Sequence, residues 1–124
     1  MVFGGYDLSK YAKENATLYW NKLIDDNYWT ISINEAKLGD YIFDLDTHSA
    51  IIDSGTSYIL MPYNDFTEFR KVVEDGRSCY IDEGKTGLFV CRCITETHSD
   101  FPDFHIKLGG SQYYKVPSTS YMTR

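Results

Sequence analysis

A carboxylate follows directly on a short apolar run near the middle of the chain. Residues 50–52 read Ala-Ile-Ile, and residues 53–57 read Asp-Ser-Gly-Thr-Ser. A charge at the end of a buried strand must be compensated by hydrogen bonds, which hydroxyl groups and close backbone N–H groups can donate. Asp53 could therefore be positioned for acid–base chemistry. The same residues can also form an ordinary turn, so the motif alone does not decide between the two interpretations.

The composition indicates the class of protein to which this carboxylate belongs. It has 124 residues, about the length of one domain, with 18 acidic and 12 basic side chains, so its net charge is 12 − 18 = −6. This balance argues against nucleic-acid binding, which needs clustered Lys and Arg. Hydrophobic residues make up 43% and aromatic residues 16%, with 11 Tyr and 7 Phe. We expect a folded and mostly β chain.

Two further classes are disfavoured by the pattern of apolar residues. No run approaches the roughly 18 apolar residues of a transmembrane helix, so we expect no membrane span. Residues 1–5 read as a short strand entering a turn, and no signal peptide is visible there. We therefore expect that the chain stays inside the cell or that its true start is missing.

Short strands dominate the predicted secondary structure. Residues 7–17 look polar and irregular, and alternation in residues 28–34 places Trp29, Ile31 and Ile33 on one face. Residues 35–44 indicate a hairpin that turns near Gly39, and a Gly109–Gly110 turn joins the last two strands. The remaining predicted strands cover residues 18–23, 49–52, 88–93, 104–108 and 112–116.

One helix is predicted among these strands. Pro62 suits its start, apolar residues recur at steps of three and four from Phe66 to Val73, and Gly76 ends it. Nothing repeats at a fixed period, and no linker divides the chain, so residues 1–124 are treated as one unit. Many short strands with one modest helix predict a β-sandwich or a barrel-like lobe.

The chain resembles the second lobe of pepsin-like aspartic proteases. Residues 51–57, followed by apolar residues 59–60 and Pro62, are similar to the active-site loop of that lobe. The resemblance extends in order over nearly the whole chain. It includes residues 3–7, 18–20 and 28–33 upstream, and residues 101–106, 109–110, 113–114 and 116–121 downstream.

The resemblance implies a role for each residue of the motif. Asp53 would be one of two carboxylates that activate a water molecule for peptide hydrolysis, without a metal or cofactor. Ser54 would bond across to the other lobe, Gly55 would donate a backbone N–H to the carboxylate pair, and Thr56 would bond to the outer oxygen of Asp53. The substrate would be a polypeptide. The residues implied to line its cleft are Tyr28, Ile51 and Ser57.

The chain contains only some of the motifs that are typical of the family. One Asp-Ser/Thr-Gly motif is present where the family has two, and no segment resembles the first lobe or the flap with its Tyr. The resemblance therefore implies a mainly β fold, an incomplete C-terminal lobe with one short helix. We expect its partner to be the missing N-terminal lobe, and the isolated chain to be inactive because one carboxylate lacks its counterpart.

The three cysteines fit the same interpretation. Cys93 precedes a hairpin where the family often has a cysteine bridged to one beyond it, which here would lie past Arg124. Cys79 and Cys91 would then pair locally. A disulfide implies an oxidising compartment, so the parent protein would be secreted or lysosomal/vacuolar. Zinc bound by these cysteines and His98 is the alternative, but Cys-x-Cys matches the usual ligand spacing poorly.

Other readings remain open. The chain could be a protease-like binding module that has lost its partner carboxylate, which sequence upstream would distinguish from an enzyme. It could also be the product of a truncated gene or pseudogene, which poor solubility would indicate. His48, His98 and His105 are scattered and are interpreted as surface or strand residues. Asn15-Ala16-Thr17 is an acceptor pattern for an N-linked sugar in a polar loop.

Overall fold

The structure is a computed structural model that describes residues 4–84 and 86–122. Strands carry most of its regular structure, which confirms the predicted mainly β class. The strands are β1 (Thr30–Leu38), β2 (Tyr41–Ile42), β3 (Ser49–Ile51), β4 (Ser78–Ile81), β5 (Phe89–Arg92), β6 (Phe104–Leu108) and β7 (Tyr113–Val116). The helices are α1 (Leu8–Tyr11), α2 (Tyr63–Val73) and α3 (Ser118–Tyr121), with a 3₁₀ turn η1 (His98–Asp100).

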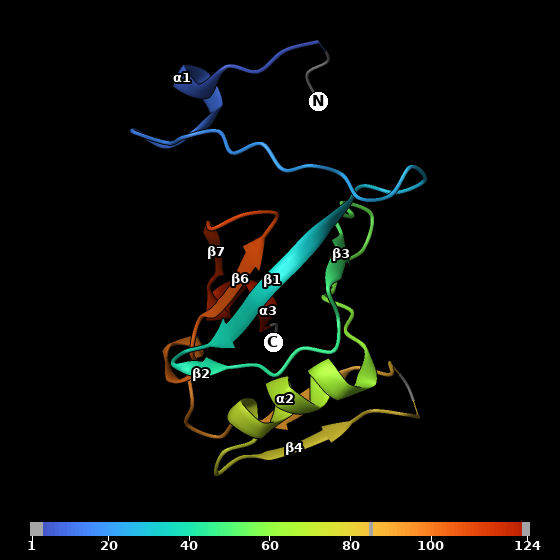
Figure 1. The fold of residues 1–124 in the computed structure, drawn as a ribbon. Coiled ribbons are helices and arrows are strands. Elements are labelled where there is room, and N and C mark those ends of the chain that lie inside the picture. The colour runs from blue at the N-terminus through green and yellow to red at the C-terminus, as the bar shows by residue number, and fades with distance from the viewer. Residues whose placement is uncertain (1–3, 85, 123–124) are drawn as a thin grey trace.

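The larger sheet is antiparallel and is built around the long strand β1 (Figure 1). One edge of β1 pairs with β6, which pairs in turn with β7. The other edge is shared by β2, where Leu38 lies opposite Tyr41, and by β3, where Thr30 lies opposite Ile51. The predicted hairpin near Gly39 is therefore confirmed. β3 occupies the end of the sheet at which β1 begins.

β1 differs from its prediction because it contains a bulge. The pairing with β6 shifts register between Ile33 and Glu35. An inserted residue reverses which alternate side chains face the core. Accordingly Ile31 is buried before the bulge, and Ala36 and Leu38 are buried after it. One continuous strand thus replaces the separate strand and hairpin arm that alternation predicted.

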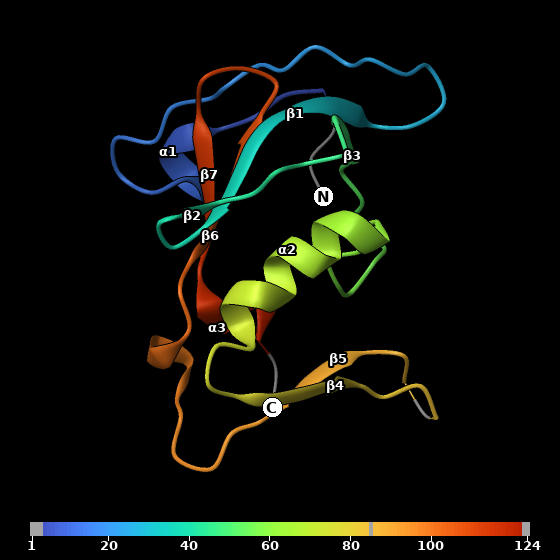
Figure 2. The same ribbon diagram turned by 60° about the horizontal axis from the view of Figure 1, so that its bottom comes forward.

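Helix α2 lies between the larger sheet and the β4–β5 hairpin (Figure 2). Pro62 precedes its first turn, and Gly76 adopts φ 69 beyond its end, as the sequence predicted. Phe69 and Val73 are its buried apolar residues. They belong to a core that joins the sheet, the helix and the loop before β6. Its buried members are Ala36, Leu38, Phe43, Phe69, Val73, Phe101 and Phe104.

A disulfide closes the β4–β5 hairpin below α2. Cys79 and Cys91 lie directly opposite each other in the antiparallel register and are bonded, which confirms the predicted pairing. Cys93 is exposed and is a free thiol within the described residues. The strand β4 itself was not predicted, because its four residues Ser-Cys-Tyr-Ile are too few for an alternating pattern to be recognised.

The segment before β1 lies beside the β6–β7 turn without joining the sheet. The predicted strand over residues 18–23 is wrong, since this segment has no regular structure. Trp29, expected to share a buried face with Ile31, is instead 71% exposed, and Trp20 is 82% exposed. Both edges of β1 are already paired, so this segment cannot pair with β1. The side-chain amide of Asn21 attaches it by donating to the hydroxyl of Tyr114, 3.2 Å away.

Two further predictions concern the N-terminal region and the turn between β6 and β7. The predicted irregular region contains the single helical turn α1, and most of the strand predicted at residues 1–5 lies outside the described residues. The predicted turn between β6 and β7 is confirmed: Gly109 has φ 67, and its N–H donates to the carbonyl of Ser32 at 2.8 Å. No helix in the described part of the chain is both long and apolar enough to span a bilayer.

Candidate active site

Asp53 stands at the point where the cross-strand hydrogen bonds of β3 end. β3 pairs with the first residues of β1. One further bond extends this pairing, because the N–H of Ile52 donates to the carbonyl of Trp29 at 2.9 Å. The next residue is Asp53, which opens the turn. The end of the sheet therefore fixes the backbone that carries the carboxylate.

Both oxygens of the Asp53 carboxylate accept hydrogen bonds from its own turn. The backbone N–H of Gly55 donates to Oδ1 at 2.7 Å, and the hydroxyl of Thr56 donates to Oδ2. A Cβ atom at position 55 would lie 3.1 Å from Oδ1, which is tighter than ordinary contact. Glycine thus allows the backbone N–H to approach the carboxylate closely.

These donors favour the ionised carboxylate. The hydroxyl of Thr56, and then the N–H of Gly55, lower the pKa of Asp53 below its usual value of 3.8. Slight desolvation opposes them. The arrangement can therefore hold a negative charge in a fixed orientation and accept a proton from a group placed against it.

The surroundings of Asp53 are more exposed than the sequence suggested. The apolar run before it was interpreted as a buried strand, but Ile51 and Ile52 are 56% and 52% exposed. The reason is that β3 is a three-residue edge strand with one neighbour. Apolar side chains beyond the turn are also exposed, and Leu60 is 82% exposed. We call the exposed apolar side chains flanking Asp53 the Asp53 surface: Tyr28, Trp29, Ile51, Ile52, Tyr58, Ile59 and Leu60.

The residues expected to line a substrate cleft come from the same end of the sheet. Ile51 pairs with Thr30, and Tyr28 lies two residues earlier in the strand-entry turn. The carboxylate of Asp25 orients that turn by accepting the N–H of Tyr28 at 3.0 Å. Ser54 and Ser57 are exposed in the Asp53 turn. Their roles in binding or bridging stay predictions, as does the catalytic role of Asp53.

The alternative zinc site is incompatible with the observed disulfide. Cys79 and Cys91 are bonded to each other, so two of the four suggested ligands are used. Among the residues described here, no three His, Cys, Asp or Glu side chains are grouped to hold a metal ion. The histidines are dispersed as expected: His48 is exposed before β3, His98 begins η1, and His105 lies within β6.

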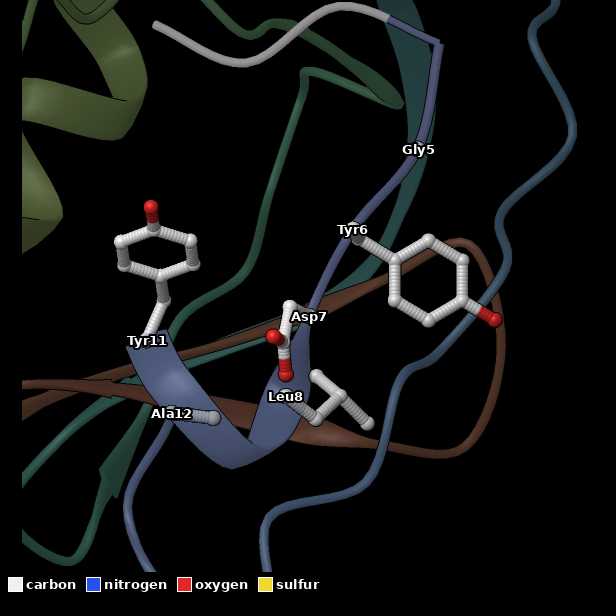
Figure 3. Close-up of a pocket in the computed structure, with 6 residues that line it drawn as sticks. All are labelled: Gly5, Tyr6, Asp7, Leu8, Tyr11 and Ala12. Atoms are coloured by element: carbon white, nitrogen blue, oxygen red, sulfur yellow. The ribbon is translucent and has the colours of Figure 1, made fainter.

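An open recess near the N-terminal end is separate from Asp53 (Figure 3). A single stretch of chain around α1 forms it, and the rings of Tyr6 and Tyr11 point to opposite sides of that stretch. A recess built by one turn of chain brings together no residues from distant elements. Its lining residues are Gly5, Tyr6, Asp7, Leu8, Tyr11 and Ala12.

Sequence reasoning missed two carboxylates that position the body of the fold. Asp65 is only 3% exposed, and it accepts the N–H of Asp46 at 2.8 Å, which anchors the loop between β2 and β3 to α2. Asp103 accepts the N–H of Ser118 at 3.1 Å and pairs with Lys115. An acidic residue in the first turn of α2 was the available signal for Asp65.

Comparison of the sequence with known proteins identifies its family. The family model of eukaryotic aspartyl protease matches residues 1–124. The chain therefore belongs to the eukaryotic aspartyl protease family, as the resemblance implied. No solved structure matches it significantly.

Curated proteins with similar sequences include a plasmepsin, a pepsin and a gastricsin. Plasmepsin VIII of Plasmodium berghei (strain Anka) is 32% identical over 85 residues, which are 64% of this chain and 22% of that protein. Pepsin A of Suncus murinus is 28% identical over 123 residues, 98% of this chain and 29% of that protein. Gastricsin of Rattus norvegicus is 27% identical over 122 residues, 96% of this chain and 28% of that protein. The chain thus spans less than a third of the length of these relatives.

Proposed function

We propose that this chain contributes Asp53 as one of the two catalytic carboxylates of an aspartic endopeptidase. The observation that supports this most directly is that both oxygens of Asp53 accept hydrogen bonds within its turn, from Gly55 and Thr56. The donors match those implied by the family motif. Their effect on the Asp53 pKa favours the charged form that a general base requires.

In this mechanism Asp53 acts together with a second carboxylate. Two such groups held close together share one proton, because both cannot be ionised at low cost. The ionised carboxylate accepts a proton from the water between them, and the water oxygen attacks the peptide carbonyl carbon. The protonated carboxylate donates its hydrogen to the carbonyl oxygen. Collapse of the tetrahedral intermediate then breaks the C–N bond as the nitrogen takes up a proton.

The proposal assigns the remaining motif residues to positioning and binding. Ser54 would bond to the loop that carries the second carboxylate, and Tyr28, Ile51 and Ser57 would contact a polypeptide substrate. Their exposure at the same end of the sheet is compatible with such contacts. A second polypeptide segment, an N-terminal lobe, would supply the other wall of the cleft and cover part of the Asp53 surface.

The compartment follows from the cysteines. Because Cys79 and Cys91 form a disulfide, we propose that the protein is secreted or resides in a lysosomal or vacuolar compartment. We also propose that residues 1–124 alone are inactive. One Asp-Ser-Gly-Thr motif is present in the sequence, so a single chain cannot create the shared-proton pair.

The test uses the full coding sequence to which this chain belongs. We expect acid-range peptide hydrolysis, and Asp53→Asn should lower turnover on the order of 10³-fold or more. Asp100→Asn is a matched control, because the Asp100 carboxylate is also exposed and also accepts from an N–H and a hydroxyl, both of Thr97. Full turnover in Asp53→Asn would overturn the proposal.

A non-catalytic peptide- or protein-binding module is the second candidate. The exposure of the Asp53 surface favours it, because large exposed apolar areas mark interaction sites. Folded full-length protein that binds peptides without cleaving them would establish this candidate in place of the enzyme. The same assay therefore separates the two functions.

A further inference from the structure

A loop on the N-terminal side of the fold carries a modification motif that the proposed function does not use. The sequence contains five asparagines, and only Asn15 has the pattern Asn-x-Ser/Thr, with Ala16 and Thr17 following. The enzyme that attaches N-linked sugars requires this hydroxyl residue two positions after the asparagine and excludes Pro between them. The motif satisfies both requirements.

The structure presents this motif as an accessible turn. The N–H of Ala16 donates to the carbonyl of Lys13 at 3.1 Å, which closes a β-turn. Asn15 occupies the third position of the turn with φ 61, a conformation that Asn adopts more readily than most residues. Residues 13–18 are all exposed, and none belongs to a helix or strand. An enzyme could therefore reach the side chain without unfolding the sheet.

A second, independent observation indicates exposure to the machinery that performs this reaction. The Cys79–Cys91 disulfide requires an oxidising environment, and in eukaryotic cells the lumen where disulfides form is also where N-linked sugars are attached. We propose that Asn15 carries an N-linked oligosaccharide. This proposal concerns a modification site and does not depend on the catalytic role of Asp53.

The proposed step is a group transfer to the side-chain amide of Asn15. The amide nitrogen forms a bond to the anomeric carbon of an oligosaccharide carried on a lipid diphosphate. The bond from that carbon to the diphosphate oxygen breaks, and the lipid diphosphate leaves with the electron pair. The amide nitrogen loses one proton, so the product is a neutral N-glycosyl amide.

The position of the turn makes a bulky sugar compatible with the proposed active site. The chain just after α1 lies on the opposite side of the molecule from β3 in both ribbon views (Figures 1 and 2). A glycan there would project from the α1 side and leave the Asp53 surface open. We therefore expect glycosylation to leave peptide binding and hydrolysis unchanged.

The experiment tests whether the chain is glycosylated inside microsomes. The chain is translated behind a cleavable signal sequence in the presence of microsomal membranes, and only the protease-protected species that has formed the Cys79–Cys91 disulfide is analysed. We expect one increase in mass, which an amidase specific for N-linked glycans removes. Asn15→Gln and Thr17→Ala should abolish the increase, and Thr17→Ser should retain it.

The controls separate chemistry from folding. Thr17→Ala keeps Asn15 and its turn, so loss of the sugar in a chain that still forms the disulfide points to the motif. Thr17→Ser restores a hydroxyl at the same position. A wild-type chain that forms the disulfide inside microsomes but gains no glycan would overturn the proposal. A glycan that persists in Asn15→Gln would do the same.

Discussion

The charge state of Asp53 depends on two donors within three residues of it. The hydroxyl of Thr56 is the larger cause of its lowered pKa, and the N–H of Gly55 is the second. Both bonds are local to the turn. The ionised state of Asp53 is therefore specified by short-range sequence, even where the surrounding cleft is not.

We expect Thr56→Val to raise the pKa of Asp53 toward its usual value of 3.8, because valine keeps the side-chain shape and removes the donor. The pKa of Asp53 is measured by NMR titration of its side-chain carboxyl carbon. Ser57→Ala is the control, because it removes a neighbouring hydroxyl that does not bond to Asp53. An unchanged Asp53 pKa in Thr56→Val would show that the hydroxyl does not stabilise the charge.

The same linkage fixes the direction of the pH dependence. A carboxyl whose pKa is lower in the folded state contributes stability above its unfolded pKa, and this contribution is lost as the pH falls through the folded value. For Asp53 the loss therefore begins as the pH falls toward 3.8 and is complete below the lowered value. Thr56→Val should show a smaller loss over the same range.

At the scale of elements, the bulge in β1 decides which side chains build the core. Leu38 lies after the bulge and is 1% exposed, next to the buried residues of α2 and β6. A strand without the inserted residue would turn Leu38 to the opposite face. The stability of the sheet should therefore be sensitive to this position.

We expect Leu38→Ala to lower the free energy of unfolding by about 2 to 5 kcal/mol, because it leaves a cavity in the core. Leu60→Ala is the matched control, since Leu60 is 82% exposed. It should change the free energy of unfolding by about 0.5 kcal/mol or less. Urea denaturation followed by far-ultraviolet circular dichroism measures both. Equal effects of the two substitutions would contradict the assignment of the core.

Local signals predicted the elements that local chemistry determines. Pro62 and Gly76 marked the limits of α2, and Gly39 and Gly109 marked hairpin turns. Residues 18–23 were misjudged because an extended segment becomes a strand only when it pairs with a neighbour, and a local pattern does not specify that pairing. The exposure of Ile51 could not be predicted either, because it depends on how many neighbours β3 has.

In the candidate site, too, some features could be predicted from the sequence and others could not. The donors to Asp53 lie two and three residues away and could be inferred from the motif. The anchoring role of Asp65 could not, because its bond to Asp46 joins residues 19 positions apart. Contacts of this kind depend on the assembled fold.

For the whole molecule, the Cys79–Cys91 disulfide joins the two strands of the outer hairpin, β4 and β5. Its ring spans a sequence separation of 12, and both sulfur-bearing residues pack against the core. We expect the double substitution Cys79→Ala and Cys91→Ala to lower the free energy of unfolding by about 3 kcal/mol, mainly through greater freedom of the unfolded chain. Chemical denaturation under non-reducing conditions measures the change.

Cys93→Ser serves as the control for this prediction. Cys93 is exposed and lies outside the disulfide in the described residues, so its substitution should leave the free energy of unfolding unchanged. Peptide mapping of the unreduced protein should recover Cys79 joined to Cys91. Recovery of Cys79 joined to Cys93 would contradict the observed pairing.

The chain's two tryptophans have a spectroscopic consequence. Trp20 and Trp29 are both largely in contact with water, so their fluorescence in the folded chain already has the red-shifted emission of solvated indole. Unfolding therefore shifts that emission little, and the signal is a poor measure of folding. Trp29 belongs to the Asp53 surface, so a polypeptide that covers this surface would move the emission to the blue. The fluorescence of Trp29 therefore reports whether a polypeptide is bound at the Asp53 surface.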